Sequence, residues 1–301
     1  MKRKALRKLR LGKPYRLTAG LTNHEHPAIS PDGRLIAYYA GPYGSIQVSV
    51  ADMQGRFAWA VSPQGGNNTQ PAWHPSGTAL VFRHQHSNDS KWELWEAKLE
   101  GDALPRAILA DPQWHYKHPF YDPAGARLTY FSDEGSAGVY HIWILDLASG
   151  ERCQVTFGDA QMHCHPVFSP DGGRIVYHAY RGTDESAMPP VTNLYELDLA
   201  SGAVRELTAG EDQYKHPFYL TDDVITYHHE RNSDGRRQLC AMHLRDGESL
   251  ALTTGKNNDK HPFPWTGRRG RMWVAWSSKK LAPEIAGESR TYDIFIASLE
   301  V

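Results

Sequence analysis

Short apolar runs separated by tight polar turns recur along nearly the whole chain. In the clearest example, residues 165–177, an apolar run precedes the turn Ser169-Pro170-Asp171-Gly172, and a second run, Ile175-Val176-Tyr177, follows it. In such a turn, proline presets φ, aspartate can bond its own backbone, and glycine supplies a positive φ. The second run consists of β-branched and aromatic residues, which pleated sheets favour. The segment therefore predicts two short strands joined by a tight turn.

This pattern occurs six times in the sequence. Each copy begins with a His-Pro or Gln-Pro dipeptide, and the first residues of these dipeptides are His26, Gln70, His118, His165, His216 and His261. The copies start 44, 48, 47, 51 and 45 residues apart. A nearly constant period in this range, with several short strands in each unit, predicts a β-propeller in which each unit is one blade.

The ends of the units predict how the ring closes. Segment 14–20 resembles segments 205–210 and 250–255, which we interpret as the fourth strands of their blades. Because segment 14–20 precedes the first unit, we expect it to pair with the last blade. The sequence thus predicts an all-β fold over residues 14–301: a six-bladed β-propeller of four-stranded antiparallel blades, closed by the N-terminal strand joining the C-terminal blade. Residues 1–13 are predicted to form a basic, solvated arm.

Composition agrees with a single repeat domain of 301 residues, because six units of roughly 45 residues use nearly the whole chain. The net charge of −1 gives no reason to expect a nucleic-acid partner. No run of apolar residues is long enough for a membrane span. The three cysteines form no CxxC pair, and the N-terminus lacks a complete signal peptide. We therefore expect a cytoplasmic protein, or a periplasmic one if the N-terminus is a processed or altered form.

The repeat resembles a known family. Residues 165–177 read His-Pro-x-Phe-Ser-Pro-Asp-Gly-x-x-Ile-x-Tyr, and they are followed by Leu-Tyr-x-x-Asp-Leu-x-x-Gly at 194–202 and Leu-Thr-x-Gly at 207–210. This phrase is similar to the TolB-like, WD40-like (PD40-type) β-propeller repeat, and the resemblance covers residues 14–301. It implies the fold and leaves the function open, because propellers serve many roles.

Histidine is the unusual feature of the composition, with sixteen residues. In a propeller the first strand of each blade lines the central channel, so the six residues that begin the copies are predicted to form a ring of five imidazoles and one amide. By strand alternation, we expect the residues two positions earlier to point the same way. These are His24, Asn68, Tyr116, His163, Tyr214 and Asp259. Loops on the same face add His84, His86, His178, His228 and His229.

Converging histidines suit a divalent metal, because neutral imidazole is the commonest side-chain ligand for zinc and similar ions. The candidate ligands are the six ring residues, and the candidate ions are zinc, manganese and nickel, with Asp259 or water completing a manganese shell. Three or four ligands would leave a position for water or substrate. The alternative is that the His-Pro dipeptide belongs to the packing of the repeat and was copied by duplication.

Positive charge is predicted on the same face. Lys117, Lys215 and Lys260 each precede a ring histidine. Second strands end near another set of cations: Arg83, Arg181 and Arg231. These side chains are either solvated rim charges or the binding groups for an anionic ligand such as a carboxylate sugar or a phosphate.

Three functions follow from these features. The first is a propeller module that binds a divalent metal, a small anionic ligand, or both at a histidine-rich channel mouth. The second is implied by the resemblance: metal-dependent lyases of uronic-acid oligosaccharides, such as oligogalacturonate lyases, resemble this repeat family and use His and Gln ligands in a propeller channel. Its base would be another ring histidine, Tyr116 or Tyr214. The third is a scaffold for a protein partner. Whether the protein is an enzyme stays open at this point.

Overall fold

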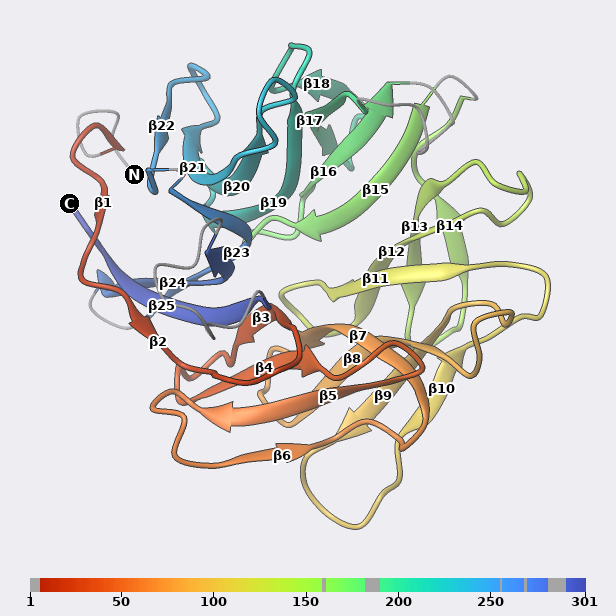
Figure 1. Ribbon diagram of the computed structural model, residues 1–301. Helices are drawn as coiled ribbons and strands as arrows, with labels where there is room; N and C mark the ends of the chain where they lie inside the picture. Colours follow the sequence, from red (N-terminus) through yellow and green to blue (C-terminus); the bar gives the residue numbers. More distant parts are fainter. Residues whose placement is uncertain (1–5, 159–160, 182–189, 255, 268–269, 281–290) are drawn as a thin grey trace.

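The computed structural model describes residues 6–158, 161–181, 190–254, 256–267, 270–280 and 291–301. Within these ranges the elements are β-strands, as the sequence predicted, apart from single helical residues at Leu6 and Gly270. The strands are arranged around a central axis (Figure 1). No helix in the described ranges has the length and apolar character needed to cross a membrane.

The strands form antiparallel groups that follow the sequence repeats. The first two groups consist of β3(His24–Ile29), β4(Leu35–Ala40), β5(Ser45–Asp52), β6(Ala58–Ala60), and of β7(Gly66–Trp73), β8(Ala79–Gln85), β9(Glu93–Lys98), β10(Arg106–Leu109). The third and fourth consist of β11(Tyr116–Tyr121), β12(Arg127–Ser132), β13(His141–Asp146), β14(Arg152–Gln154), and of β15(Gln161–Phe168), β16(Arg174–Arg181), β17(Thr192–Asp198), β18(Val204–Glu206).

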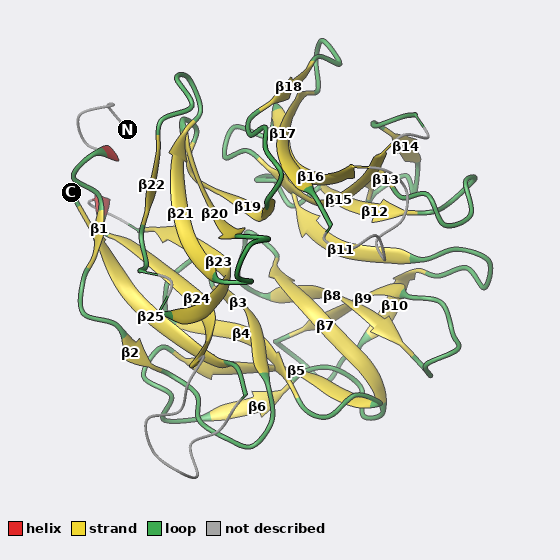
Figure 2. Cartoon of the chain, turned by 45° about the horizontal axis from the view of Figure 1, so that its top comes forward, coloured by secondary structure: helices red, strands yellow, loops and turns green. Residues whose placement is uncertain are grey.

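The last two groups complete the chain. They consist of β19(Gln213–Thr221), β20(Val224–Glu230), β21(Arg237–His243), β22(Ser249–Ala251), and of β23(Asn257–Thr266), β24(Met272–Lys280), β25(Asp293–Glu300) with two N-terminal strands. The first strands of the groups, β3, β7, β11, β15, β19 and β23, are called the inner strands below. Figures 1 and 2 show them near the middle of the molecule, with β6, β10, β14, β18 and β22 toward the outside.

The predicted turn joins the first and second strands of a group. In the first group, Ser30 accepts a backbone hydrogen bond from Gly33 and donates one to Leu35. Gly33 has a φ of 72°, a value that a residue without Cβ adopts without strain. The equivalent Gly172 has the same φ of 72°. The turn chemistry read from the sequence is therefore present in the structure.

The N-terminal segment pairs with the C-terminal strand, as predicted. Strands β1(Arg10–Leu11) and β2(Tyr15–Arg16) both run antiparallel to β25. Leu6 and Leu9 are buried in the core that β24 and β25 form with β20 and β21. The expectation of a solvated arm is wrong for these residues, because their apolar side chains cover an otherwise open sheet face.

The core lies between neighbouring groups rather than at one centre. Ile36 of β4 packs with Ile294 and Ile296 of β25, and Val176 of β16 packs with Ile225 of β20. Each group therefore contacts its neighbours on both sides, as in other repeat proteins. The inner strands are held on all sides and can carry polar side chains at the axis.

Candidate functional site

The six residues that begin the copies share one unusual backbone conformation. These ring residues are His26, Gln70, His118, His165, His216 and His261, and their φ values lie between 50° and 57°. They are the non-glycine residues with positive φ in the described part of the chain. Such a conformation is uncommon outside glycine, and a following proline favours extended backbone instead. Each position stores strain of roughly 1–3 kcal/mol, which the surrounding sheets must hold.

A β-bulge accompanies each ring residue. In every inner strand the register with the second strand shifts at the dipeptide, for example between Lys215 and Phe218 in β19 and between Lys260 and Phe263 in β23. The same shift occurs in β3, β7, β11 and β15. A bulge bends its strand and re-aims a side chain. Bulge and positive φ together turn the ring side chains toward the axis.

The bulge also overturns one expectation. The residues two positions before the ring residues were predicted to point into the same channel, and they do not join the ring. His24 lies 3.4 Å from Asp293, and Asp259 accepts a hydrogen bond from the Trp276 indole at 3.1 Å. Simple alternation fails because the extra residue at the bulge interrupts it. His24 thus contacts β25 of the last group, whereas Asp259 contacts β24 of its own group.

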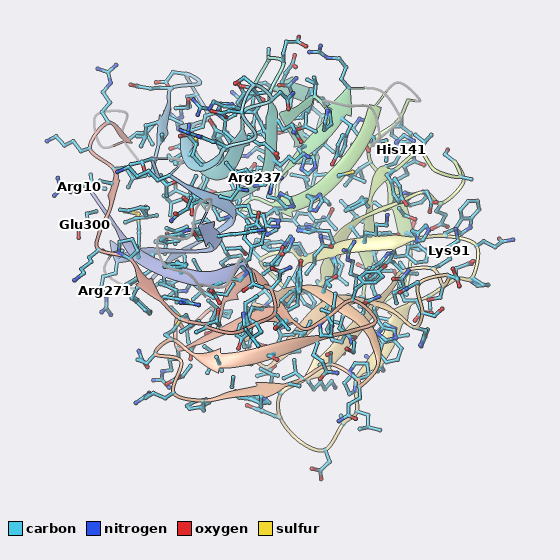
Figure 3. All side chains as sticks on the ribbon, viewed as in Figure 1. Arg10, Lys91, His141, Arg237, Arg271 and Glu300 are labelled. Carbon is cyan, nitrogen blue, oxygen red and sulfur yellow. The ribbon has the colours of Figure 1, made fainter. Side chains whose placement is uncertain are left out.

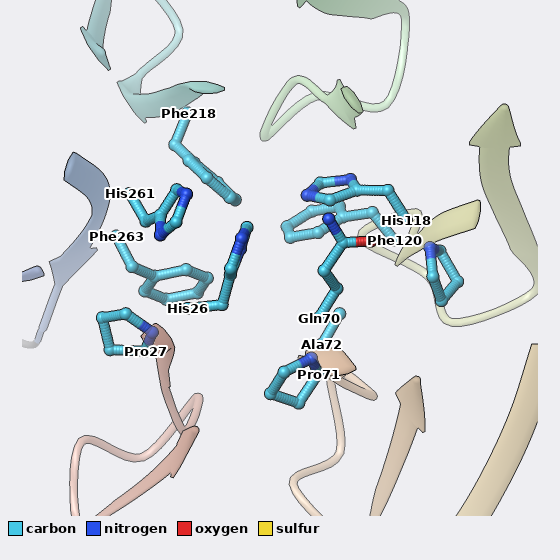
Figure 4. Close-up of a pocket in the computed structure, with 11 residues that line it drawn as sticks. His26, Pro27, Gln70, Pro71, Ala72, His118, Phe120, Phe218, His261 and Phe263 are labelled. Carbon is cyan, nitrogen blue, oxygen red and sulfur yellow. The ribbon is translucent and has the colours of Figure 1, made fainter. Parts of the chain in front are cut away.

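The ring side chains converge closely at the axis (Figure 4). The His26 and His261 rings stack with their centroids 3.6 Å apart, and His216 lies 4.4 Å from His261. On the other side, His118 and His165 lie 4.5 Å apart, and Gln70 Nε2 is 3.2 Å from His165 Nε2. All six predicted ring residues are therefore brought together.

Three of the imidazoles could hold one metal ion. Ligand nitrogens of His26, His216 and His261, called the triad below, all lie within 4.8 Å of one another. Three nitrogens at about 2.1 Å from one ion lie at most about 4.2 Å apart, so small ring rotations would suffice. The Nδ1 atoms of His216 and His261 are buried without a hydrogen-bond partner. An unpartnered buried nitrogen is costly, and a metal ligand bond or a water would satisfy it.

Other ring atoms share this lack of partners. Gln70 Oε1 and the Nδ1 atoms of His118 and His165 are also buried and unpartnered. Burial lowers the pKa of His118 to about 3. It also lowers the pKa of every other ring histidine well below its ordinary value, and neighbouring imidazoles add to the effect. The ring is therefore a set of neutral imidazoles, the form that binds metals.

Two of the predicted loop histidines extend the ring. His178 stacks on His165 at 4.7 Å, and His228 stacks on His216 at 4.9 Å. Both lie in second strands. The remaining loop histidines make other contacts: His84 bonds Asn68 and His86, and His229 pairs with Asp212 at 2.8 Å.

A charged cluster that the sequence reading missed lies beside the triad. Glu25 Oε2 is 2.8 Å from Lys260 Nζ and 3.8 Å from His261 Nδ1. The Tyr39 hydroxyl donates to the same carboxylate at 3.1 Å, and the Tyr39 ring stacks on His26 at 5.5 Å. The available signal was that the residue before the ring residue is polar or charged in five copies, namely Glu25, Thr69, Lys117, Lys215 and Lys260, and Cys164 in the sixth.

The predicted cations divide into two sets. Lys260 and Arg83 act on the ring, because their charges help lower the pKa of ring histidines, and Lys215 helps lower the pKa of the adjoining His178. Lys117 Nζ donates a hydrogen bond to the Tyr140 hydroxyl at 2.7 Å. Figure 3 shows another cation, Arg237, near the middle of the molecule, whereas Arg10 and Lys91 lie at its edge.

Two predicted cations lie in local ion pairs instead. Arg181 binds the exposed Glu211 at 2.9 Å, and Arg231 binds Asp234 at 2.6 Å within a turn. These pairs give neither arginine a contact with the ring.

The two tyrosines considered as bases are packed away from the ring. Tyr116 is fully buried, its hydroxyl contacts Glu134 and Arg152, and burial raises its pKa to about 12. Tyr214 stacks on His229 at 4.7 Å. Both tyrosines make these contacts within their own strand groups. Their geometry does not favour a role at the axis.

Below the ring the channel is lined by aromatic rather than polar side chains. Phe120, Phe218 and Phe263 line a cavity of about 10 Å³ together with ring residues, so they form a floor under the ring (Figure 4). The same three rings line a larger cavity of about 670 Å³, whose wall is mostly aromatic and proline side chains. The floor therefore separates a polar site from an apolar one.

Comparison with known proteins identifies the fold. No family model matches the chain. It is 22% identical over 236 residues to the Tol-Pal system protein TolB of Francisella tularensis, a match that covers 77% of this chain and 51% of the relative. The chain thus spans about half the length of the curated relatives it matches.

Solved structures agree with this likeness. TolB from Acinetobacter baumannii superposes with a TM-score of 0.65 at 19% identity, covering 80% of this chain and 57% of that one. The β-propeller domain of the trilobed protease from Pyrococcus furiosus gives 0.58 at 13%, covering 93% and 94%. Oligogalacturonate lyase in complex with manganese gives 0.57 at 12%, covering 97% of both. The predicted TolB-like propeller repeat is confirmed, and the chain has a β-propeller fold.

Proposed function

We propose that this protein is a six-bladed β-propeller, closed by pairing of its N-terminal strands with the C-terminal blade, that binds one divalent transition metal at its axis. The triad would hold the ion. The observation that carries the proposal is the convergence of three neutral imidazoles, whose ligand nitrogens lie within 4.8 Å of one another. Gln70, His118 and His165 would form the opposite side of the ring and leave a position for a ligand.

An anionic ligand is the second part of the proposal. Lys117, Lys215 and Lys260 come from the inner strands directly before ring residues, and Arg83 adds a fourth positive charge. A bound metal would supply further positive charge and act as a Lewis acid toward a carboxylate. We expect these cations to orient the carboxylate of a ligand over the ring, because charge-assisted bonds are strongest where water is excluded.

A metal-dependent lyase of acidic oligosaccharides is the second candidate. Its support is the fold likeness to oligogalacturonate lyase, one structure of which is in complex with manganese. In such a reaction a base removes the proton adjacent to the carboxylate, and the electron pair forms a double bond as the leaving group departs. His118 and His165 are the candidate bases, because they are neutral and face the triad across the ring.

A protein partner remains a third candidate. The relatives are Tol-Pal system proteins by name, and a propeller face can bind another protein. This role needs no metal, so a measurement of metal content distinguishes it from the first two candidates. A cytoplasmic location remains a prediction.

The test is metal content. Protein purified without a histidine tag is incubated with zinc, manganese or nickel, passed through a desalting column and measured by elemental analysis. We expect close to one ion per chain in the wild type and less than a tenth of that in His216→Ala. His118→Ala is the matched control and should retain most of the metal. No bound ion under any condition would refute the metal proposal and leave the protein-partner role.

A further inference from the structure

The six copies differ at the position just before the ring residue. Their backbones are nearly identical there, since all ring residues have φ values within 7° of one another. Yet one copy carries a glutamate, Glu25, where three carry lysine. The fold does not dictate this residue, because the other copies adopt the same bulge without it. A role beyond the fold is therefore worth testing at Glu25.

The contacts of Glu25 point to the triad. Its carboxylate is almost fully buried and lies 3.8 Å from Nδ1 of His261, a nitrogen without a hydrogen-bond partner. Among the described residues, this is the carboxylate that approaches a ring imidazole. Metal-binding histidines usually donate their second N–H to a carboxylate, which fixes the tautomer and the ring orientation.

Two neighbours hold Glu25 in place. Lys260 Nζ lies 2.8 Å from its Oε2, and the Tyr39 hydroxyl donates to the same atom. Tyr39 also stacks on His26, and the Lys260 ammonium lies 3.9 Å above the Tyr292 ring. The carboxylate is thus fixed between two strands, β3 and β23, that each supply one residue of the triad.

We propose that Glu25 is a positioning residue for the metal site: it accepts the Nδ1–H of His261 and so presents Nε2 of that ring to the ion. This inference rests on the proposed function, since it needs a metal at the triad. Lys260 competes for the same carboxylate and balances its charge. The 3.8 Å separation closes to a hydrogen bond with a small movement of either side chain.

The experiment is a cobalt titration followed by visible absorption. We expect Glu25→Gln to bind Co²⁺ 10- to 100-fold more weakly than the wild type, the usual cost of losing such a carboxylate, and Glu25→Asp to recover part of the loss. At saturation the absorption band of Glu25→Gln should differ from that of the wild type, because the orientation of one ligand has changed. Asp259→Asn is the matched control: it removes a second buried carboxylate, in β23, that does not approach a ring imidazole, and its affinity should stay within threefold.

The double variant Glu25→Gln/Lys260→Met separates position from charge, since it keeps the net charge of the wild type. We expect it to remain at least tenfold weaker; wild-type affinity in this variant would overturn the inference. Lys260→Met alone frees Glu25 for His261 and should bind at least threefold more tightly. If Glu25→Gln does not fold, the Co²⁺ affinities of Glu25→Asp and Lys260→Met test the inference in its place. Unchanged or weaker Co²⁺ binding in Lys260→Met counts against it.

The failures are distinguishable. A wild-type protein that binds no cobalt refutes the proposed function itself. A wild-type protein that binds cobalt, beside a folded Glu25→Gln that binds within threefold of it, refutes only the role of Glu25.

Discussion

The ring has two halves that share one backbone conformation but carry different side-chain arrangements. On one side His26, His216 and His261 bring their nitrogens within 4.8 Å of one another, next to Glu25 and Lys260. On the other side a side-chain amide, Gln70, lies in hydrogen-bond contact with His165. The φ values of the two halves are the same within a few degrees. Repetition has therefore fixed the conformation while the chemistry has diverged, and only one half has the arrangement of a metal site.

The largest effect is expected from the floor that both halves share. Phe218 packs with Val167 and Ile225 in the core, and its ring lies 5.9 Å from Phe120 and 5.3 Å from Phe263. Phe218→Ala should lower the free energy of unfolding by about 3–5 kcal/mol, because it removes a buried ring and leaves a cavity. Urea denaturation measures this value. The exposed Phe57→Ala is the control and should change it by less than about 0.5 kcal/mol; a loss below about 1 kcal/mol in Phe218→Ala would show that the floor does not support the ring.

The next effect separates the halves. A metal that binds the folded protein raises its stability by about 2.7 kcal/mol at a concentration one hundred times the dissociation constant. We expect added zinc to raise the melting temperature of the wild type and of His165→Ala, and to have no effect on His261→Ala. Differential scanning calorimetry would check this. Equal responses of the two variants would mean that the halves are equivalent.

The pH dependence should be common to both halves. In the metal-free protein the folded-state pKa values of the ring histidines lie below the ordinary 6.5, so the unfolded state binds more protons below that pH. Stability should therefore fall as the pH drops from about 6.5 toward the folded-state values. We expect the melting temperature to decrease by at least about 3 °C between pH 7 and pH 5. A flat profile over this range would contradict neutral, buried imidazoles.

The smallest effect concerns the shared backbone. At His118, φ is 50°, so an alanine would be strained by roughly 1–2 kcal/mol whereas a glycine would not. His118→Gly should therefore be more stable than His118→Ala by about 1 kcal/mol in chemical denaturation. The adjacent Lys117 has no positive φ, and there the order should reverse. The same order at both positions would argue against the strained conformation.

The sequence predicted the strands, the turns and the ring because each of these repeats. A His-Pro dipeptide in five copies and Gln-Pro in the sixth identifies the ring residues without a structure. Residues 14–20 resemble a fourth strand but precede the first unit, which predicted that they pair with the last blade. In the structure β2 pairs with β25.

The remaining features could not be read from the pattern. The bulge leaves no signal in the composition. Strand alternation therefore wrongly predicted that residues such as His163 point toward the axis. The His163 ring instead contacts the His141 ring, with the centroids 5.5 Å apart. Contacts between copies, such as Glu25 with Lys260, join residues more than two hundred positions apart. The burial of Leu6 and Leu9 depends on a surface that the repeats form only once folded.

The most direct measurement is anomalous diffraction from crystals of the protein grown with zinc. The account predicts one anomalous peak at the axis, within bonding distance of nitrogens from His26, His216 and His261, and none beside Gln70 and His118. A peak on the Gln70 side, or no peak at the ring in fully zinc-treated crystals, would contradict the claim that the triad is the metal site.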